Sequence, residues 1–281
     1  MQTIVVGIDT ELPSRTALDW VIERTALTPA RLRLVTVIAD GPFGSRRATR
    51  DLAAAAARVV AARPRIALET KLVSGAGIAE ALAAEAVDAD LLVIGHHRSR
   101  IIRSLVAGAL PAQIAAAAPC PVVIVPHDWL RRFGKSVVGV QFDGSSDSAL
   151  EFAAAETAAT GRSLDIVQVT ESPGHPGGLT LLSAPDLAAG RSPQLARAVD
   201  SARAGRAGLA VRTFSVSGDP DRVLRAHGRD AALVVVGSHG HGALDAVWRG
   251  ARSYAFMNWS KAPLCVVPAG WHATTLEESP T

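Results

Sequence analysis

Residues 91–126 read LLVIGHHRSRIIRSLVAGALPAQIAAAAPCPVVIVP, and residues 233–268 read LVVVGSHGHGALDAVWRGARSYAFMNWSKAPLCVVP. Two glycines and two prolines recur 142 residues apart: Gly95, Gly108, Pro121 and Pro126 reappear as Gly237, Gly250, Pro263 and Pro268. Four residues with special backbone requirements at one separation indicate an internal repeat. The chain is therefore expected to contain two copies of one structural unit.

Each copy alternates short apolar runs with segments of helical spacing. In the first copy we expect strands at about 3–9, 31–39, 66–73, 89–95 and 121–125, and helices at about 12–27, 48–62, 78–87 and 103–117. In the second we expect strands at about 136–142, 164–169, 210–216, 232–237 and 264–267, and helices at about 147–159, 193–204, 220–228 and 246–259. The alternation predicts an α/β fold of two tandem five-stranded parallel sheets, each sandwiched by helices.

The domain boundaries follow from a break in this pattern. HDWLRRFGK at 127–135 fits neither element, so we expect a first domain at 1–128, a second at 135–270 and a flexible tail at 271–281. Early landmarks such as Gly7 and Gly139 are 132 rather than 142 residues apart, which places an insertion in the Gly/Pro-rich stretch 172–186. An uncovered edge strand is a liability, so the copies are expected to pair as an intramolecular pseudo-dimer, with homodimerisation as a further expectation.

Composition excludes several classes of protein. The net charge is only +3, from 29 basic and 26 acidic residues, without the basic stripe of a nucleic-acid-binding protein. No apolar run reaches transmembrane length, and the N-terminus lacks the pattern of a secretory signal. We therefore expect a cytoplasmic protein that binds no nucleic acid or membrane, with Cys120 and Cys265 as buried free thiols.

The glycine-rich loop after the fourth strand of each copy is the candidate functional site. In the second copy Gly237, Ser238, His239 and Gly240 follow the strand, and Gly250 comes after nine further residues. Glycines let the backbone approach a ligand closely, and amides between a strand end and a helix start attract anions. The loop therefore predicts a phosphate-binding site.

The strand VVGID at 5–9, the G-x2-G-x9-G loop and the closing APCPVVIVP and APLCVVP segments point to one family. Over nearly all of residues 2–268 the chain resembles the universal stress proteins, in the tandem form common in actinobacteria. The resemblance implies a Rossmann-like fold of the adenine nucleotide alpha-hydrolase-like type. It also implies ATP, with Mg²⁺, as the ligand, and signalling through a regulatory protein partner.

In the first copy the resemblance assigns nucleotide-binding roles to Asp9 at the ribose, Val37 near the adenine, Gly95 and Gly108. The alternative for Asp9 is a purely structural role, as the cap of the first helix or in a turn. Arg98 stands where the family has its second motif glycine; it either closes the phosphate site or contributes a guanidinium to it. Ala109 and Pro111 replace the two hydroxyl positions of the family motif.

The second copy is assigned Val169, Gly237, Gly240 and Gly250, with Ser238 and His239 in the same loop and Ser253 at the later hydroxyl position. Ala251 replaces the first hydroxyl, and Gln141 occupies the position of Asp9, although Asp143 follows closely. The more complete glycine pattern makes the second copy the favoured nucleotide site.

Three functions remain open on this sequence. The first is a regulatory protein that binds ATP or a related adenine nucleotide, and the second is a nucleotide-free scaffold whose altered loops contact proteins. The third, an ATP-splitting enzyme, has only a faint counterpart in Gly144-Ser145-Ser146. We expect no enzyme beyond incidental ATP hydrolysis, because no nucleophile elbow or Walker motif is present.

Two histidine patterns have simpler interpretations than metal binding. His96, His97, His239 and His241 have no cysteine or carboxylate at zinc-ligand spacing, so no metal site is expected. His227 lies near the end of an expected helix, where a charged imidazole would favour the helix dipole.

Overall fold

The computed structural model describes residues 1–9, 12–38, 42–75, 77–96, 109–131, 133–170, 193–238 and 261–273. The elements of the first half are β1 (Gln2–Gly7), α1 (Leu12–Leu27), β2 (Ala30–Ile38), α2 (Pro42–Ala62), β3 (Leu68–Ser74), α3 (Ile78–Glu85), β4 (Leu91–His96), α4 (Ala109–Ala117) and β5 (Val122–Pro126). Those of the second half are β6 (Ser136–Val140), α5 (Asp147–Ala159), β7 (Leu164–Thr170), α6 (Pro193–Arg203), β8 (Val211–Ser217), α7 (Pro220–Gly228), β9 (Leu233–Gly237) and β10 (Leu264–Val267).

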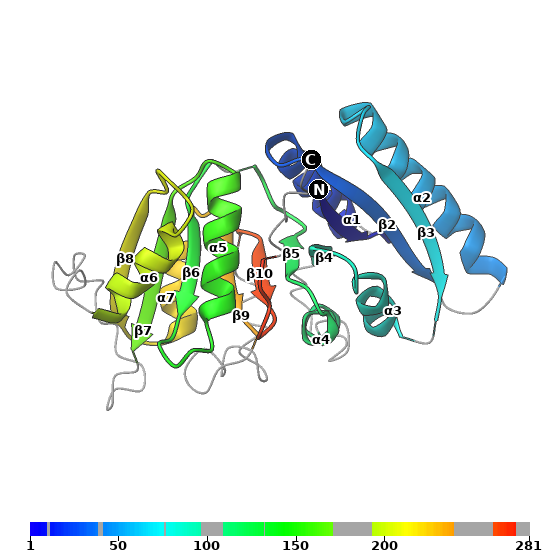
Figure 1. Ribbon diagram of the computed structural model, residues 1–281. Coiled ribbons are helices and arrows are strands. Elements are labelled where there is room, and N and C mark those ends of the chain that lie inside the picture. The colour runs from blue at the N-terminus through cyan, green and yellow to red at the C-terminus, as the bar shows by residue number, and fades with distance from the viewer. Residues whose placement is uncertain are drawn as a thin grey trace.

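These strands form one sheet with the order β3-β2-β1-β4-β5-β10-β9-β6-β7-β8. The predicted α/β fold class is confirmed, because each half contributes five parallel strands flanked by helices. Figure 1 shows the halves side by side with β5 and β10 between them. Exchanging the two copies reverses the strand order onto itself, so the halves are related by an approximate twofold axis at the β5–β10 junction.

The halves meet through an antiparallel strand pair. Cys265 of β10 lies opposite Val123 of β5, and Leu264 lies opposite Ile124. Strands are parallel within each half, so the strands of the two halves run in opposite directions across the junction. The carboxyl end of β4 therefore lies at one end of the strands of the continuous sheet, and the carboxyl end of β9 lies at the other.

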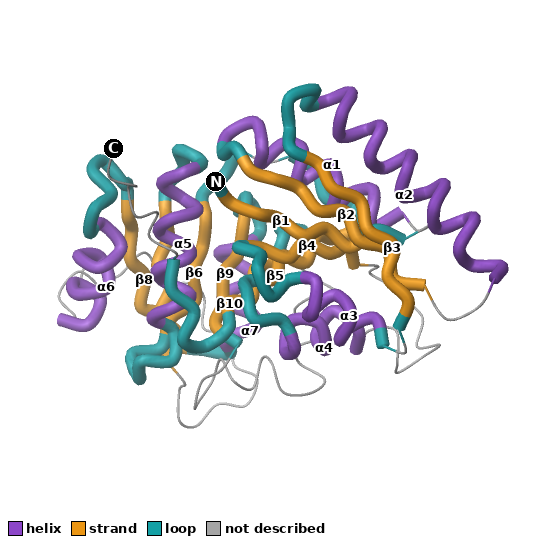
Figure 2. The backbone as a smooth tube through the Cα atoms, turned by 45° about the vertical axis from the view of Figure 1, so that its right-hand side comes forward, coloured by secondary structure: helices purple, strands orange, loops and turns teal. Residues whose placement is uncertain are grey.

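Alternating side chains supply a core on each face of the sheet. Ile4 and Val6 of β1 pack in the cluster that includes Leu18 of α1, whereas Val5 packs with Leu82 of α3. Figure 2 shows α1 and α2 on one side of the first-half strands and α3 and α4 on the other. Because both clusters contain residues of both halves, the junction is part of the core.

A buried ion pair also crosses the junction. Arg24 of α1 donates from Nε and Nη2 to the two carboxylate oxygens of Glu156 in α5, at 2.8 and 2.7 Å. Only 4% and 6% of the two side chains are exposed. Positions 24 and 156 are 132 residues apart, the same separation as Gly7 and Gly139, so the repeat places opposite charges at equivalent positions.

Several expected boundaries differ from the structure or lie outside it. Helix α2 begins at Pro42, well before residue 48, because proline suits the first turn of a helix. The first residues of the expected tail 271–281 are held: Trp271 packs edge to face on Phe152, and Ala273 N–H donates to Glu151. The insertion at 172–186 and the helix expected at 246–259 lie outside the described residues. Within the described ranges, no helix combines the length and hydrophobicity needed to cross a bilayer.

Candidate functional site

A pocket with a volume of about 110 Å³ opens at the carboxyl ends of β1, β2 and β4 in the first half. Its walls are mostly apolar, with Val35 and Val37 from β2, Leu82 from α3, Ile94 from β4 and Ile114 from α4. Open parallel sheets bind ligands at this edge. The pocket can therefore take an apolar, flat group such as a purine base.

Close packing of α3 on the sheet shapes this pocket. A side chain on Gly7 would place its Cβ 3.3 Å from Ile94 Cγ2 and 3.4 Å from Leu82 Cδ1. The equivalent Gly139 has the same relation to Leu224, whose Cδ2 would lie 3.1 Å from an added Cβ. Gly7 is the last residue of β1 and Gly139 the last but one of β6, and at both a helix leucine approaches the backbone closely.

Asp9 provides the polar end of the pocket. It follows β1 directly, its side chain is exposed, and its backbone carbonyl accepts a hydrogen bond of 3.0 Å from Ser14 Oγ. Ser14 also lines the pocket. This bond ties the residue after β1 to the first turn of α1, so the position of Asp9 is defined by the fold.

A second cavity adjoins the first at Asp9. It has a volume of about 200 Å³, shares Ile8, Asp9 and Ser14 with the apolar pocket, and is also lined by Arg15 and Asp51. Together the two volumes reach the roughly 300 Å³ at which ligand pockets begin. A ligand with an apolar base and a polar extension would place its middle at the Asp9 carboxylate.

The structure brings three of the predicted first-half residues into one pocket. Asp9, Val37 and Gly95 all line it, although they come from three separate strand ends. Arg98 and Gly108, the other two predicted residues of this half, lie outside the described residues. The expected base and ribose contacts are therefore adjacent.

The predicted residues of the second half are described only in part. Val169 of β7 is buried, at 5% exposure, and Gly237 ends β9. Ser238 N–H donates to Val267 C=O at 2.8 Å, so this amide belongs to the sheet and is not open to a phosphate. His239, Gly240, Gly250 and Ser253 lie outside the described residues.

Gln141 differs in environment from Asp9, to which it corresponds. Its N–H donates to Ser146 Oγ at 2.9 Å, and its Oε1 is buried without a hydrogen-bond partner among the described residues. Asp143, the nearby acid, accepts a 3.0 Å bond from Ser145 N–H in the following turn. Gln141 is not an acid, and the exposed carboxylate of Asp143 lies two residues further along the chain, where it is engaged by the Ser145 turn.

The sequence did not single out Ser14, and it suggested Ser146 only as part of an enzyme loop, yet both serines bind the backbone just after the first strand of their half. The signal was present, because each serine lies five residues after the position of interest, Asp9 or Gln141. A hydroxyl kept at one place in both copies indicates a shared backbone contact.

The expectation about metals concerns residues that are described only in part. His96 ends β4 and is buried, at 6% exposure. His97, His239 and His241 lie outside the described residues. Across the ranges that are described, no three His, Cys, Asp or Glu side chains gather as a metal site would require.

Comparison with known proteins matches the duplicated architecture. The model of the Universal stress protein family matches residues 1–126 and again residues 132–268. No curated protein matches the sequence of this chain.

Solved structures resemble the whole chain. A universal stress protein from Archaeoglobus fulgidus is 17% identical, with a TM-score of 0.72 over 96% of this chain and 97% of its own. A putative universal stress protein from Pseudomonas aeruginosa is 15% identical, with a TM-score of 0.59 over 96% and 94% of the two chains. A universal stress protein solved in complex with cAMP is 31% identical over 45% of this chain and 97% of its own, with a TM-score of 0.39.

Proposed function

The chain belongs to the universal stress protein family, and from this membership we propose that it binds an adenine nucleotide, ATP with Mg²⁺ in the first instance. The bound nucleotide regulates contacts with a protein partner, and the chain is not a dedicated enzyme. The geometry that supports this proposal best is in the first half.

The observation that best supports the proposal is that Asp9, Val37 and Gly95 line one apolar pocket at the carboxyl ends of β1, β2 and β4. An adenine ring would lie against Val37, and its ribose hydroxyls would donate to the Asp9 carboxylate. Such charge-assisted hydrogen bonds contribute about 1.5–3 kcal/mol each. Gly95 leaves room for the ligand where the chain leaves β4.

The second half has a weaker claim among the described residues than its glycine pattern suggests. Gln141 offers an amide in place of a carboxylate, and the Ser238 amide is already bonded to Val267. A second-half site would therefore depend on residues 239–253. We assign the first half as the tighter adenine site and the second as the weaker one.

Nucleotide binding is tested by calorimetric titration of the purified chain with Mg·ATP. We expect Asp9→Ala to weaken binding about 10- to 100-fold, because one or two charge-assisted hydrogen bonds are lost. The matched control is Gln141→Ala, which removes the equivalent side chain of the second half and should leave the tighter affinity unchanged.

Two results would change the proposal. If Gln141→Ala weakens binding and Asp9→Ala does not, the tighter site lies in the second half. If the wild-type chain shows no heat and no thermal shift at millimolar ATP, the chain is a nucleotide-free scaffold. Gln141 and the engaged Ser238 amide are the described features that favour this second function.

A further inference from the structure

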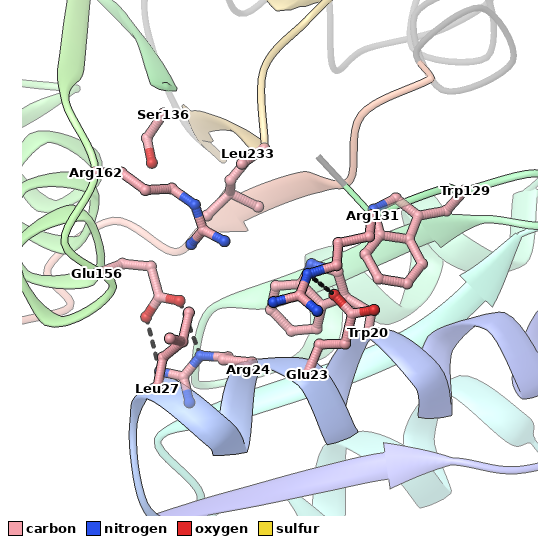
Figure 3. Close-up of a pocket in the computed structure, with 11 residues that line it drawn as sticks. Trp20, Glu23, Arg24, Leu27, Trp129, Arg131, Ser136, Glu156, Arg162 and Leu233 are labelled. Carbon is pink, nitrogen blue, oxygen red and sulfur yellow. Dashed lines mark hydrogen bonds and ion pairs between the residues drawn. The ribbon is translucent and has the colours of Figure 1, made fainter. Parts of the chain in front are cut away.

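A polar cavity lies between the two halves, away from the pocket at Asp9. Its volume is about 30 Å³, and its charged residues are Glu23, Arg24, Arg131, Glu156 and Arg162. Arg24 and Glu23 come from α1, Glu156 from α5, and Arg131 from the segment that joins the halves. Figure 3 shows Arg162 entering from one side and Arg131 from the other.

The charges in this cavity do not balance. Both oxygens of Glu156 bind Arg24, at 2.8 and 2.7 Å, and Glu23 forms a 3.2 Å ion pair with Arg131. No described residue forms a hydrogen bond or ion pair with the Arg162 side chain, which is half-buried. Three guanidinium groups thus face two carboxylates.

A surplus buried charge is costly unless a counter-charge reaches it. Burial lowers the pKa of Arg162, and the nearby Arg131 guanidinium lowers it further, against the opposing effect of Glu156. Arg24 Nη1 is also buried without a hydrogen-bond partner among the described residues. The cavity therefore has positive charge and unused donors.

We propose that this cavity binds a small oxyanion between the two halves, with Arg162 as its main ligand and Arg131 as the second. Guanidinium groups bind phosphate and carboxylate through paired N–H donors. The cavity, of about 30 Å³, holds about two water molecules and excludes a nucleotide, so a small oxyanion such as inorganic phosphate or a simple carboxylate would bind at its mouth, where the half-buried Arg162 and the exposed Arg131 reach solvent. Because Arg162 belongs to the second half and Arg131 to the linker, the bound anion stabilises the contact between the two halves.

The test is the thermal stability of the full chain in phosphate and in chloride at equal ionic strength. We expect phosphate at about ten times its dissociation constant to raise the wild-type Tm by about 2–4 °C. Trp20 and Trp129 line the cavity, so their fluorescence should change over the same phosphate concentrations.

Arg162→Gln removes the surplus guanidinium and should abolish both the Tm shift and the fluorescence change. The matched control is Arg197→Gln, because Arg197 is an exposed arginine on α6 of the same half and should leave both responses intact. Arg162→Lys keeps the charge without the paired donors and should bind phosphate more weakly than wild type.

Without phosphate, Arg162→Gln should be at least as stable as wild type, since an unpaired charge has been removed. The proposal is overturned if wild type shows no phosphate-specific shift, or if Arg162→Gln retains the full shift. A shift lost equally in Arg197→Gln would also overturn it, because the effect would then follow net charge.

Discussion

The His227 ring lies edge to face against Phe214, with ring centroids 4.8 Å apart. Burial lowers the pKa of His227; the nearby Lys135 and Arg212 lower it further, and Asp165 opposes them. His227 lies in the last turn of α7, as the sequence predicts, but the lowered pKa favours the neutral imidazole and so weakens its interaction with the helix dipole. Burial therefore affects the pKa of His227 more than its position at the helix end does.

This environment predicts a loss of stability in acid. A histidine with a lowered pKa in the folded chain binds its proton more readily when unfolded, so stability falls as the pH drops below about 6.5. We expect the Tm of wild type to fall more between pH 7 and pH 5 than that of His227→Phe, which keeps an aromatic ring but does not titrate. Equal losses in the two proteins would show that His227 is not involved.

Among the elements, the linker is more closely attached than its sequence suggests. Lys135 C=O accepts a 2.8 Å hydrogen bond from Ala232 N–H, next to the start of β9. A Cβ on Gly134 would overlap the backbone carbonyl oxygen of Asp230. A backbone carbonyl cannot move aside as easily as a flexible side chain. Position 134 therefore requires glycine, because the Asp230 backbone lies so close to it.

Gly134→Ala is therefore expected to destabilise the chain by about 3 kcal/mol, at the upper end of overpacking effects. Gly75→Ala is the matched control, because its Cβ would lie at an ordinary 3.8 Å from Ala81. Urea denaturation followed by circular dichroism measures both variants. Similar midpoints for the two would mean that the linker shifts without cost.

The sequence predicted the elements well where apolar runs were long. Parallel strands are buried on both faces and read as continuous hydrophobic runs, so β4 and β9 lay close to their expected ranges. Gly95 and Gly237 could be placed from the ends of their strands, whereas Asp9 and Val37 were singled out by the resemblance to the family. The environment of Gln141 and the bond that occupies Ser238 could not, because both depend on contacts that local pattern does not encode.

Across the whole molecule, equivalent positions of the two copies carry opposite charges at two places. Arg24 faces Glu156 across the junction, and these positions correspond in the two copies. Arg33 pairs with Glu69 in the first half, whereas the corresponding Asp165 is fully buried and bonded to Arg212 in the second. Opposite charges at position 24 and its equivalent favour pairing of unlike copies, because two like copies would bring equal charges together.

Removing one partner of the junction pair should cost about 3–5 kcal/mol, because the other is left buried and unpaired. We expect this loss in Arg24→Met and in Glu156→Leu, measured by urea denaturation. The double variant Arg24→Met/Glu156→Leu should regain most of it, since an apolar pair fits the same site. Additive losses in the double variant would show that the two side chains contribute separately.

Because β4 and β9 run in opposite directions, a ligand bound in one half would not obstruct a ligand bound in the other. Ligands at these two strand ends would be separated by the length of the strands and by β5 and β10, which lie between β4 and β9. One molecule could then sense two metabolite concentrations at once, with no competition for space. Any coupling between the two ligands would have to pass through the β5–β10 strand pair and the arginine-lined cavity, where the two halves meet.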